Sequence, residues 1–261
     1  MNSKLFRDRI IWISGASSGI GKALSLRLAR EGARVAMTAR RAEVLEEIRA
    51  GQPTEMAERL LPLPADVLDP DALEKAYRQL TDTWGLPDMV IANAGTHIHM
   101  EPKDINAADC RKIIDVNLEG AVNLLTLVVP DFMAREQGHL IGVASLSGYR
   151  GLPNAAAYGA SKAGLINFLQ GLRFDLQPHG IAVTVINPGF VKTPLTDRNP
   201  FPMPFLIEVD QAIDAILDGL QKEKKEIHFP WQVSWILKTL RVLPYPLYHR
   251  LVRRITQKDR Q

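Results

Sequence analysis

The chain has 261 residues, of which 46% are hydrophobic and 23% charged, and its formal net charge is +3. A chain of this size can bury the core of one α/β domain, and its balanced composition excludes a disordered protein and gives no sign of nucleic-acid binding. Cys110 is the only cysteine, so an internal disulfide and a thiolate metal cluster are excluded, as expected of a reducing cytosol. The polar N-terminus lacks the apolar stretch of a secretory signal, and no run of about 18 apolar residues follows, so we predict a cytoplasmic protein.

Short apolar, β-rich runs alternate with longer segments of helical periodicity. The predicted strands are residues 9–14, 34–39, 59–65, 88–92, 138–144 and 181–186. The clearest helical segments between them are residues 19–31, 70–84 and 157–177. This alternation is typical of a parallel sheet with helices on both faces. Four prolines between Pro194 and Pro204, among them Pro200, break regular structure and indicate a loop or lid.

A glycine turn follows the first predicted strand directly, with Gly15, Gly19 and Gly21 ahead of a helix. The residues between these glycines include Ser17, Ser18 and Ile20. Glycines permit a sharp turn and a close approach of backbone N–H groups to a pyrophosphate, and the helix N-terminus favours the anion. The G-x-x-x-G-x-G spacing differs from G-x-G-x-x-G, and a plain tight turn is the alternative. The position after the first strand favours dinucleotide binding.

The end of the second predicted strand discriminates between cofactors. An acidic residue there binds the adenosine ribose hydroxyls, whereas a basic one accommodates a 2′-phosphate. Here Ala39 supplies no carboxylate and Arg40 and Arg41 follow, with the planar guanidinium of Arg40 suited to phosphate. A solvated charge pair at a helix start is the alternative. We predict a preference for NADP(H) over NAD(H).

Tyr158 and Lys162 stand four residues apart in a predicted helix, so their side chains share one face. A tyrosine with a pKa near ~10 is a poor base at neutral pH, but a cation about 4 Å away at an effective dielectric of ~20 contributes roughly 4 kcal/mol, or about three pKa units. The phenol would then titrate near ~7, provided that the cation, aided by an oxidised nicotinamide ring, outweighs the opposing effect of burial. The pair therefore favours acid–base catalysis, with an ordinary surface pair as the alternative.

Several further motifs accompany this pair in order along the chain. They are Ser14-Gly15-Ala-Ser-Ser-Gly19-Ile-Gly21, Asp66-Val67, Asn93-Ala94-Gly95, Asn117, Ser145, Tyr158-Gly-Ala-Ser-Lys162, and Asn187-Pro188-Gly189 with Thr193. In this combination the chain resembles the short-chain dehydrogenase/reductase family from about Arg7 to Phe229. The resemblance implies an α/β, doubly wound Rossmann fold with a mostly parallel seven-stranded sheet. We expect residues 1–230 to form this cofactor-binding and catalytic domain and residues 231–261 to form a helical extension.

The resemblance implies a catalytic set. In this family the tyrosine matching Tyr158 is the general acid and base, and the lysine matching Lys162 lowers its pKa and holds the nicotinamide ribose. Ser145 lies 13 residues before Tyr158 and matches the serine that binds the substrate carbonyl oxygen, whereas the spacing disfavours its rival Ser147. Asn117 matches the asparagine that positions a water in the proton relay, with an ordinary polar residue at a helix bend as the alternative.

The resemblance also implies a cofactor-binding set. Asp66 matches the carboxylate that reads the adenine amino group, Val67 the residue against the ring, and Asn93 the residue that steadies the central strand. The segment 188–193 matches the part that closes over the nicotinamide carboxamide. The full predicted set is Gly15, Ser17, Ser18, Gly19, Ile20, Gly21, Arg40, Arg41, Asp66, Val67, Asn93, Ala94, Gly95, Tyr158, Lys162, Pro188, Gly189, Val191 and Thr193.

Two positions depart from the family pattern. Ser14 stands where the family usually has threonine, which retains the hydroxyl. Ser18 stands where many NADP-dependent members carry a basic residue, so the cofactor prediction rests mainly on Arg40.

The last residues of the chain follow a different pattern. Seven basic residues and one acidic residue lie from Trp231 to the end. Apolar residues at helical spacing form two stripes, made of Trp231, Trp235, Ile236, Leu240 and Leu243, then Leu247, Tyr248, Leu251, Val252 and Ile255. Apolar side chains opposite cations are typical of an interfacial membrane helix that binds anionic lipid. Packing over the substrate cleft or against a second subunit is an equal alternative, and a lipid-like substrate would suit both arrangements.

We therefore predict an NADP(H)-dependent oxidoreductase that interconverts a carbonyl and an alcohol by hydride transfer, acting as a reductase of a hydrophobic, lipid-like or steroid-like ketone or aldehyde. A catalytically silent NADPH-sensing scaffold and a membrane adaptor are the alternatives. His97 and His99 have no further metal ligand nearby, so we predict no metal and favour a place beside the substrate cleft. We expect no nucleic-acid partner, and membrane contact at the inner face as one role of residues 231–261. The resemblance implies a homodimer or homotetramer that pairs through helices near 104–136 and 157–178.

Overall fold

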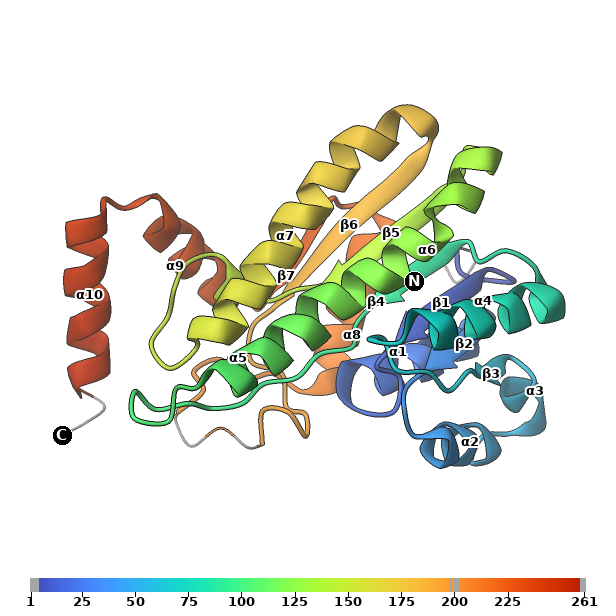
Figure 1. Ribbon diagram of the computed structural model, residues 1–261, viewed down its shortest axis with the longest axis horizontal. Helices are drawn as coiled ribbons and strands as arrows, with labels where there is room; N and C mark the ends of the chain where they lie inside the picture. The colour runs from blue at the N-terminus through green and yellow to red at the C-terminus, as the bar shows by residue number, and fades with distance from the viewer. Residues whose placement is uncertain (1–4, 198, 200–201, 259–261) are drawn as a thin grey trace.

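All six predicted strands form, and a seventh joins them in one sheet (Figure 1). The computed structural model describes residues 5–197, 199 and 202–258, with side chains of the last helix up to Arg254. Pro200, Arg260 and the side chain of Ile255 therefore lie outside the described residues. The strands are β1 (Ile10–Ser14), β2 (Arg34–Thr38), β3 (Leu60–Pro62), β4 (Met89–Ala92), β5 (Gly138–Val143), β6 (Ile181–Pro188) and β7 (Glu226–Phe229).

The helices connect and cover these strands. They are α1 (Gly19–Arg30), α2 (Ala42–Ala50), α3 (Thr54–Ala57), α4 (Pro70–Trp84), α5 (Ala107–Ile114), α6 (Gly120–Arg135), α7 (Ala156–Leu176), α8 (Val209–Gln221), α9 (Trp231–Val242) and α10 (Tyr245–Lys258). A π-helical segment, Asp115–Glu119, joins α5 to α6, and a 3-10 turn, Leu146–Gly148, precedes α7.

The strand order is β3-β2-β1-β4-β5-β6-β7, and every pair of neighbouring strands is parallel. The predicted α/β, doubly wound Rossmann fold with seven strands is therefore confirmed. Chain order reverses between β1 and β4, which makes this the point where the two halves of the sheet diverge. In such sheets, ligands bind outside the carboxyl ends of the strands at this point.

The side chains of β1 alternate between two hydrophobic cores, one on each face of the sheet. Trp12 is buried on the face covered by α4, α6 and α7, where its ring stacks on Tyr77 with centroids 5.6 Å apart and its indole N–H donates to Thr38 Oγ1 at 2.8 Å. Ile11 and Ile13 are buried on the opposite face, with α1 and α8. Helices thus cover both faces of the sheet. The carboxyl ends of the strands are left accessible to a ligand.

Residues 107–135 form a continuous helical stretch whose most apolar window reaches a mean hydropathy of 1.5. By length and composition alone this stretch could cross a membrane, contrary to the expectation that the chain has no such segment. Its residues Leu124, Leu125 and Val128 are buried in the core against the sheet. Core helices of soluble proteins pass the same test, so this stretch is weak support for a membrane span.

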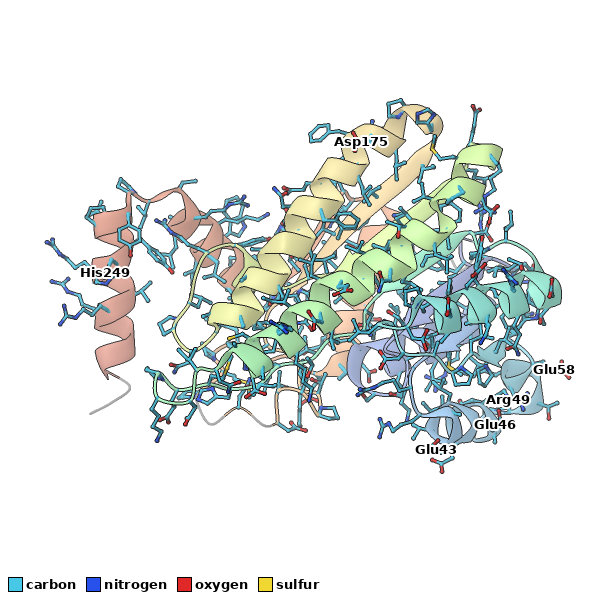
Figure 2. All side chains as sticks on the ribbon, in the orientation of Figure 1. Glu43, Glu46, Arg49, Glu58, Asp175 and His249 are labelled. Carbon is cyan, nitrogen blue, oxygen red and sulfur yellow. The ribbon has the colours of Figure 1, made fainter. Side chains whose placement is uncertain are left out.

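The extension forms two helices, α9 and α10, set at an angle to each other at one end of the molecule (Figure 1). Val233 and Leu237 of α9 pack against the core cluster on the α7 face. Helix α10 lies further out, and His249 projects from it away from the rest of the molecule (Figure 2). The extension therefore continues the hydrophobic core on one side and borders solvent on the other.

Candidate active site

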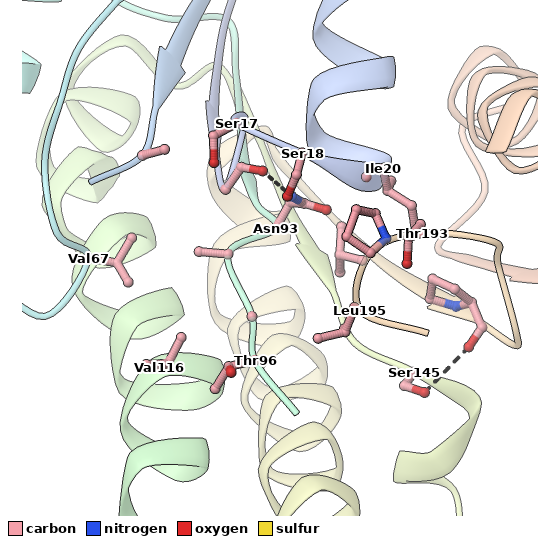
Figure 3. A pocket seen from close by; sticks show the side chains of 18 of the residues that line it. Ser17, Ser18, Ile20, Val67, Asn93, Thr96, Val116, Ser145, Thr193 and Leu195 are labelled. Atoms are coloured by element: carbon pink, nitrogen blue, oxygen red, sulfur yellow. Dashed lines mark hydrogen bonds between the residues drawn. The ribbon is translucent and has the colours of Figure 1, made fainter. Parts of the chain in front are cut away.

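The loops that follow β1, β4, β5 and β6 meet at the carboxyl edge of the sheet. This arrangement brings together segments that are far apart in the sequence, since the four strands end at Ser14, Ala92, Val143 and Pro188. They enclose a cavity of about 580 Å³ (Figure 3). The cavity lies where the topology predicts a ligand.

The glycine turn forms the floor of this cavity at the start of α1. Gly15 has φ +68°, and a β-carbon there would lie only 2.7 Å from the Cα of Ala94. A β-carbon at Gly21 would overlap the carbonyl oxygen of Gly15 and the amide of Asn93. The N-cap residue Ser18 makes no side-chain capping bond within the described part of the chain, so the first N–H groups of α1 are available to an anion.

Two side chains hold the loop after β4 against the glycine turn. The hydroxyl of Ser14 accepts from the backbone N–H groups of Asn93 and Ala94, both at 3.1 Å. The Asn93 amide donates to the carbonyl oxygens of Ser14 at 3.0 Å and Gly15 at 3.2 Å. A serine thus suffices at position 14, because the structural task there needs only a hydroxyl.

Nearly all predicted cofactor residues line the cavity. Only Gly21 does not, because it packs beneath the turn. Arg40 and Arg41 lie in the wall at the end of β2, and Arg41 donates to the hydroxyl of Ser17 at 3.3 Å. The glycine floor, the open helix N-terminus and two guanidinium groups fit the phosphates of a dinucleotide.

The wall also contains residues that the sequence analysis missed. These are Ala39, Ala65, Thr96, Lys112, Val116, Val143, Ala144, Pro194, Leu195 and Thr196. Lys112 and Val116 are one helical turn apart where α5 runs into the π-helical segment, so they share a face. In the sequence, the spacing of these two residues indicates only a shared helix face. It does not indicate a binding role without knowledge of the cavity beside them.

Ser145 and Tyr158 lie together at the inner end of the cavity. Ser145 is buried, is hydrogen-bonded to Tyr158, and its hydroxyl accepts from the backbone N–H of Ser147 at 3.1 Å. Ser145 lines this cavity, whereas Ser147 does not. The structure thus places the serine favoured by spacing next to the phenol.

Lys162 is buried beneath Tyr158 on the same face of α7. Its ammonium lies 5.9 Å from the centroid of the Tyr158 ring and donates to the carbonyl oxygen of Val143 at 2.9 Å. Burial lowers the pKa of Lys162 to about 8. Burial also raises the pKa of Tyr158, and the hydrogen bond with Ser145 offsets only part of this effect.

The chain's own groups do not bring the pKa of Tyr158 near neutrality, so the shift expected of Lys162 together with an oxidised nicotinamide stays a prediction. Desolvation of the phenolate is the largest effect on the phenol, and it favours the protonated form. The ammonium is itself desolvated. The consequence is a tyrosine that holds its proton.

Asn117 is fully buried within the π-helical segment rather than at a simple helix bend. Its Oδ1 accepts from Thr96 N–H at 2.7 Å, and its Nδ2 donates to the Thr96 carbonyl and the Ser161 hydroxyl, each at 3.0 Å. Beside it, a β-carbon on Gly95 would lie 3.3 Å from Asn117 Oδ1 and 3.5 Å from Lys162 Nζ. Asn117 and Lys162 therefore border the same small space.

A second cavity of about 380 Å³ adjoins the first and is mostly apolar. The two share the wall residues Ser145, Tyr158, Gly189, Leu195 and Thr196. The remaining wall consists of His97, Leu146, Ser147, Leu152, Pro153, Asn154, Ala155, Phe190, Asn199, Pro204, Phe205, Val233, Ile236, Leu237, Leu240 and Val252. Five of these residues belong to α9 and α10, so the extension forms one side of this cavity.

Two polar clusters fix the extension in that position. Lys238 of α9 pairs with Glu226 at 3.0 Å, and the same carboxylate accepts from Tyr149 at 2.5 Å and from Asn187 at 2.9 Å. Hydrogen bonds to three groups stabilise the charged form and lower the pKa of Glu226 against the effect of burial.

The second cluster centres on Arg150. Its guanidinium donates to the carbonyl oxygens of Leu240 at 2.5 Å and Leu243 at 2.8 Å, which lie at the end of α9. It also lies 3.9 Å from the ring centroid of Tyr248, whose hydroxyl donates to the Gly151 carbonyl. Arg150 thus ties both extension helices to the loop before α7.

His97 lines the apolar cavity, as favoured by the sequence, whereas His99 is not part of either cavity wall. Among the described residues, no group of three or more His, Cys, Asp or Glu side chains is arranged to hold a metal ion.

Comparison with known proteins decides the family. A family profile described as "short chain dehydrogenase" matches residues 9–200 of this chain. This chain belongs to the short-chain dehydrogenase family. An uncharacterized oxidoreductase of Myxococcus xanthus is 42% identical over 252 residues, which cover 95% of this chain and 97% of the relative. A match of that coverage includes more than half of the extension.

Solved structures agree with this assignment. A short-chain dehydrogenase from Burkholderia cenocepacia in complex with NADP is 26% identical, with a TM-score of 0.81 over 94% of this chain and 98% of that one. A 3-ketoacyl-(acyl-carrier-protein) reductase from Brucella melitensis complexed with NADH shares the fold at 24% identity, with a TM-score of 0.78 over 88% of this chain and 99% of that one. This short-chain dehydrogenase is therefore an oxidoreductase that uses a nicotinamide nucleotide.

Proposed function

We propose that this protein is an NADP(H)-dependent reductase that converts a hydrophobic ketone or aldehyde into an alcohol. One observation carries the proposal, namely that Tyr158 and Ser145 stand in the shared wall of the dinucleotide cavity and the apolar cavity. A carbonyl group held in the apolar cavity would meet both hydroxyls at the boundary with the cofactor. The bound nicotinamide supplies the hydride, and the chain supplies the proton and the orientation.

The catalytic roles follow from the contacts of each side chain. Ser145 is placed to donate a hydrogen bond to the substrate carbonyl oxygen, and Tyr158 to donate the proton to that oxygen. The raised pKa of Tyr158 keeps the phenol protonated, which suits the reducing direction. Lys162 holds a positive charge beneath the phenol below about pH 8, and that charge stabilises the phenolate left after proton transfer.

Asn117 completes the proposed proton path. Its Oδ1 and the Lys162 ammonium border the space next to Gly95. A water held there would return a proton from solvent toward Tyr158 through Lys162. The two bonds to Thr96 and the bond to Ser161 fix the orientation of the Asn117 amide for this task.

The preference for NADP(H) rests on the end of β2. Arg40 and Arg41 both line the cavity, and the wall there offers alanine at position 39 in place of a carboxylate. A guanidinium group binds a phosphate through charge-assisted, bidentate hydrogen bonds, whereas it offers no acceptor to a ribose hydroxyl pair. The test is the ratio of the dissociation constants of NADPH and NADH, and equal affinity for both would contradict the preference.

The hydrophobic nature of the substrate rests on the second cavity. Its wall is dominated by leucine, isoleucine, valine, proline and phenylalanine side chains. Each methylene transferred from water into such a site contributes about 0.8 kcal/mol, or roughly a fourfold gain in kcat/KM. The experiment is a screen of NADPH oxidation with ketones and aldehydes of graded chain length. A rate that does not rise with chain length would overturn the assignment.

We further propose that the extension contacts the inner face of a membrane from the cytoplasm. The outer side of α9 exposes Trp231 and Trp235, at 66% and 63%, and α10 exposes Leu247 and Leu251. An apolar surface of this kind marks an interaction site. The excess of basic residues in the extension favours anionic lipid over a second copy of the same surface, which would repel it.

Co-sedimentation tests this contact without deleting α9, whose inner side packs on the core. We expect binding to vesicles that contain phosphatidylglycerol, weaker binding to neutral phosphatidylcholine vesicles, and loss of binding in the variant W231E/W235E. Binding that is equal for all vesicles and unchanged in the variant would contradict the proposal, as would self-association through this surface.

The remaining apolar surface favours a homodimer or homotetramer that pairs through α5, α6 and α7. Phe174 of α7 is 80% exposed, and Ile114 at the end of α5 is also exposed. The apolar side chains Val122, Leu127 and Val129 of α6 are only partly covered. Light scattering of wild type and Phe174→Glu tests this, and a monomeric wild type would contradict it.

A further inference from the structure

The polar side chain beside the proton donor in the apolar cavity is His97. Its ring centroid lies 4.9 Å from that of Tyr158, with the planes at 69°, so the two rings meet edge to face. Both residues line the apolar cavity. A substrate bound through its carbonyl oxygen to Tyr158 would therefore pass close to the imidazole.

The imidazole of His97 has hydrogen-bonding capacity that the described residues do not use. Its Nδ1 is buried and has no partner among the described residues, and no bond of its other ring nitrogen is formed within that part of the chain. Two other polar side chains of the wall are engaged, since Thr196 donates to the Val191 carbonyl at 2.7 Å and Ser145 accepts from Ser147. Asn199 Oδ1 is also buried without a partner among the described residues, but the side chain in ring contact with Tyr158 is His97. A buried polar group without a partner costs about 1–3 kcal/mol, so a ligand that supplies the partner recovers part of this cost.

The charge state of His97 limits what that partner can be. Burial, reinforced by the neighbouring His99, lowers the pKa of His97. The ring is therefore neutral at physiological pH, with one nitrogen a donor and the other an acceptor. A neutral imidazole in an apolar wall suits an uncharged oxygen and gives no ion pair to a carboxylate.

We infer that the substrate carries a second, uncharged oxygen β to the reacting carbonyl, as in a 3-oxo ester, and that His97 binds this oxygen. The inference rests on the proposed reductase function and adds the chemistry of the substrate next to the reacting group. Tyr158 and Ser145 hold the carbonyl that is reduced. His97, whose ring contacts that of Tyr158, binds the second oxygen. The apolar remainder of the cavity binds the hydrocarbon part of the substrate.

The test compares two substrates and three proteins. A 3-oxo ester and a simple methyl ketone with the same alkyl chain are reduced by wild type, His97→Phe and His99→Phe. Phenylalanine at position 97 keeps a ring against Tyr158 and removes only the nitrogens. His99 is in the same loop outside both cavity walls, so His99→Phe is the matched control.

We expect His97→Phe to lower the ratio of kcat/KM for the oxo ester over the methyl ketone by roughly 5- to 10-fold, the size of one hydrogen bond. The change should lie mainly in KM for the oxo ester, with the NADPH dissociation constant within about twofold of wild type. His99→Phe should leave the ratio unchanged. Because the readout is a change in ratio, the greater intrinsic reactivity of the oxo ester cancels.

Two results would overturn the inference and leave the reductase assignment intact, namely a ratio that is the same in wild type and His97→Phe, or an equal loss with both substrates. If wild type reduces neither compound nor any carbonyl of the graded series, the proposed function itself fails. The two failures are therefore distinguishable.

Discussion

The two cavities that meet at Tyr158 are built in different ways. The dinucleotide cavity is formed by the ends of neighbouring strands and the turns that follow them, with much of its floor made of backbone. The apolar cavity is formed by side chains from the loop at position 97, the segment 145–155, the extension, and residues of the chain after β6 such as Phe190, Leu195 and Phe205. The first cavity reflects local chain geometry, whereas the second depends on how distant segments pack.

This difference explains why one half of the site is easier to recognise than the other. A pyrophosphate makes directional bonds to N–H groups and cations, and these demands fix residue types at fixed spacing. Binding of an apolar ligand requires only apolar surface area and a cavity of matching shape, which many different side chains can provide. Substrate selection is therefore free to vary while the cofactor cradle stays the same, and the following experiments test that division.

The largest effect is expected from Tyr158→Phe, which removes the proton donor shared by both cavities. Loss of general acid catalysis costs typically 10²- to 10⁴-fold, so we expect turnover to fall by about 10³-fold. Steady-state NADPH oxidation measures this. The dissociation constant of NADPH, followed by fluorescence, should stay within about threefold, and turnover near the wild-type rate would refute the assignment of the acid.

The double variant Arg40→Ala, Arg41→Ala changes only the cofactor side of the comparison. We expect NADPH to bind roughly 30- to 100-fold more weakly, because two charge-assisted contacts with a 2′-phosphate are lost. NADH binding and the chain-length dependence of the substrate should persist. An equal weakening of NADPH and NADH would show that these arginines do not read the 2′-phosphate.

Lys162→Met is expected to abolish catalytic activity and to raise the free energy of unfolding. Lys162 has a pKa of about 8 in the folded chain against an ordinary value of 10.5, so folding disfavours its charged form. Burying the charged lysine lowers the free energy of unfolding of the wild type by about 3 kcal/mol below pH 8. The variant avoids this cost but loses the hydrogen bond to the Val143 carbonyl, which contributes about 1 kcal/mol. The variant should be inactive and yet unfold at higher denaturant concentration at pH 7.

The difference in stability between wild type and Lys162→Met should depend on pH. Between about pH 8 and 10.5 the unfolded wild-type chain holds more protons at this lysine than the folded chain, so wild-type stability rises relative to Lys162→Met. The advantage of the variant should therefore shrink through this range and vanish above it. A constant difference from pH 7 to 10.5 would mean that Lys162 is not desolvated in the folded state.

The smallest effect is expected from Ile236→Ala in the apolar cavity. Ile236 lines this cavity and is 53% exposed, so its truncation should cost little stability. For long-chain ketones assayed without membranes, we expect kcat/KM to fall roughly 5- to 10-fold, with short-chain ketones unchanged. Trp235→Ala is the control, because Trp235 is adjacent but outside the cavity wall. Equal losses in both variants would argue that α9 does not contact substrate.

Much of the fold and of the cofactor site was predictable from the sequence. The alternation of strands and helices is a local signal, and the glycine turn, Asn93 and the Tyr158–Lys162 spacing occur at strand ends that meet at one edge of the sheet. The fold could be predicted from this pattern because parallel strands connected by helices can pair in few ways. The wall residues Lys112 and Val116 were not predictable, because their importance comes only from the loop opposite them.

The sequence by itself determined the family, the parallel sheet and most of the residues that line the cavity at the strand ends, because backbone geometry and anion binding restrict which amino acids can occupy those positions. Only the tertiary structure decided that α9 and α10 close one side of the apolar cavity, that Arg150 and Glu226 fix them there, and that burial raises the pKa of Tyr158. Those features depend on desolvation and on contacts such as that between Arg150 and Leu240, which are 90 residues apart, and a linear pattern records neither.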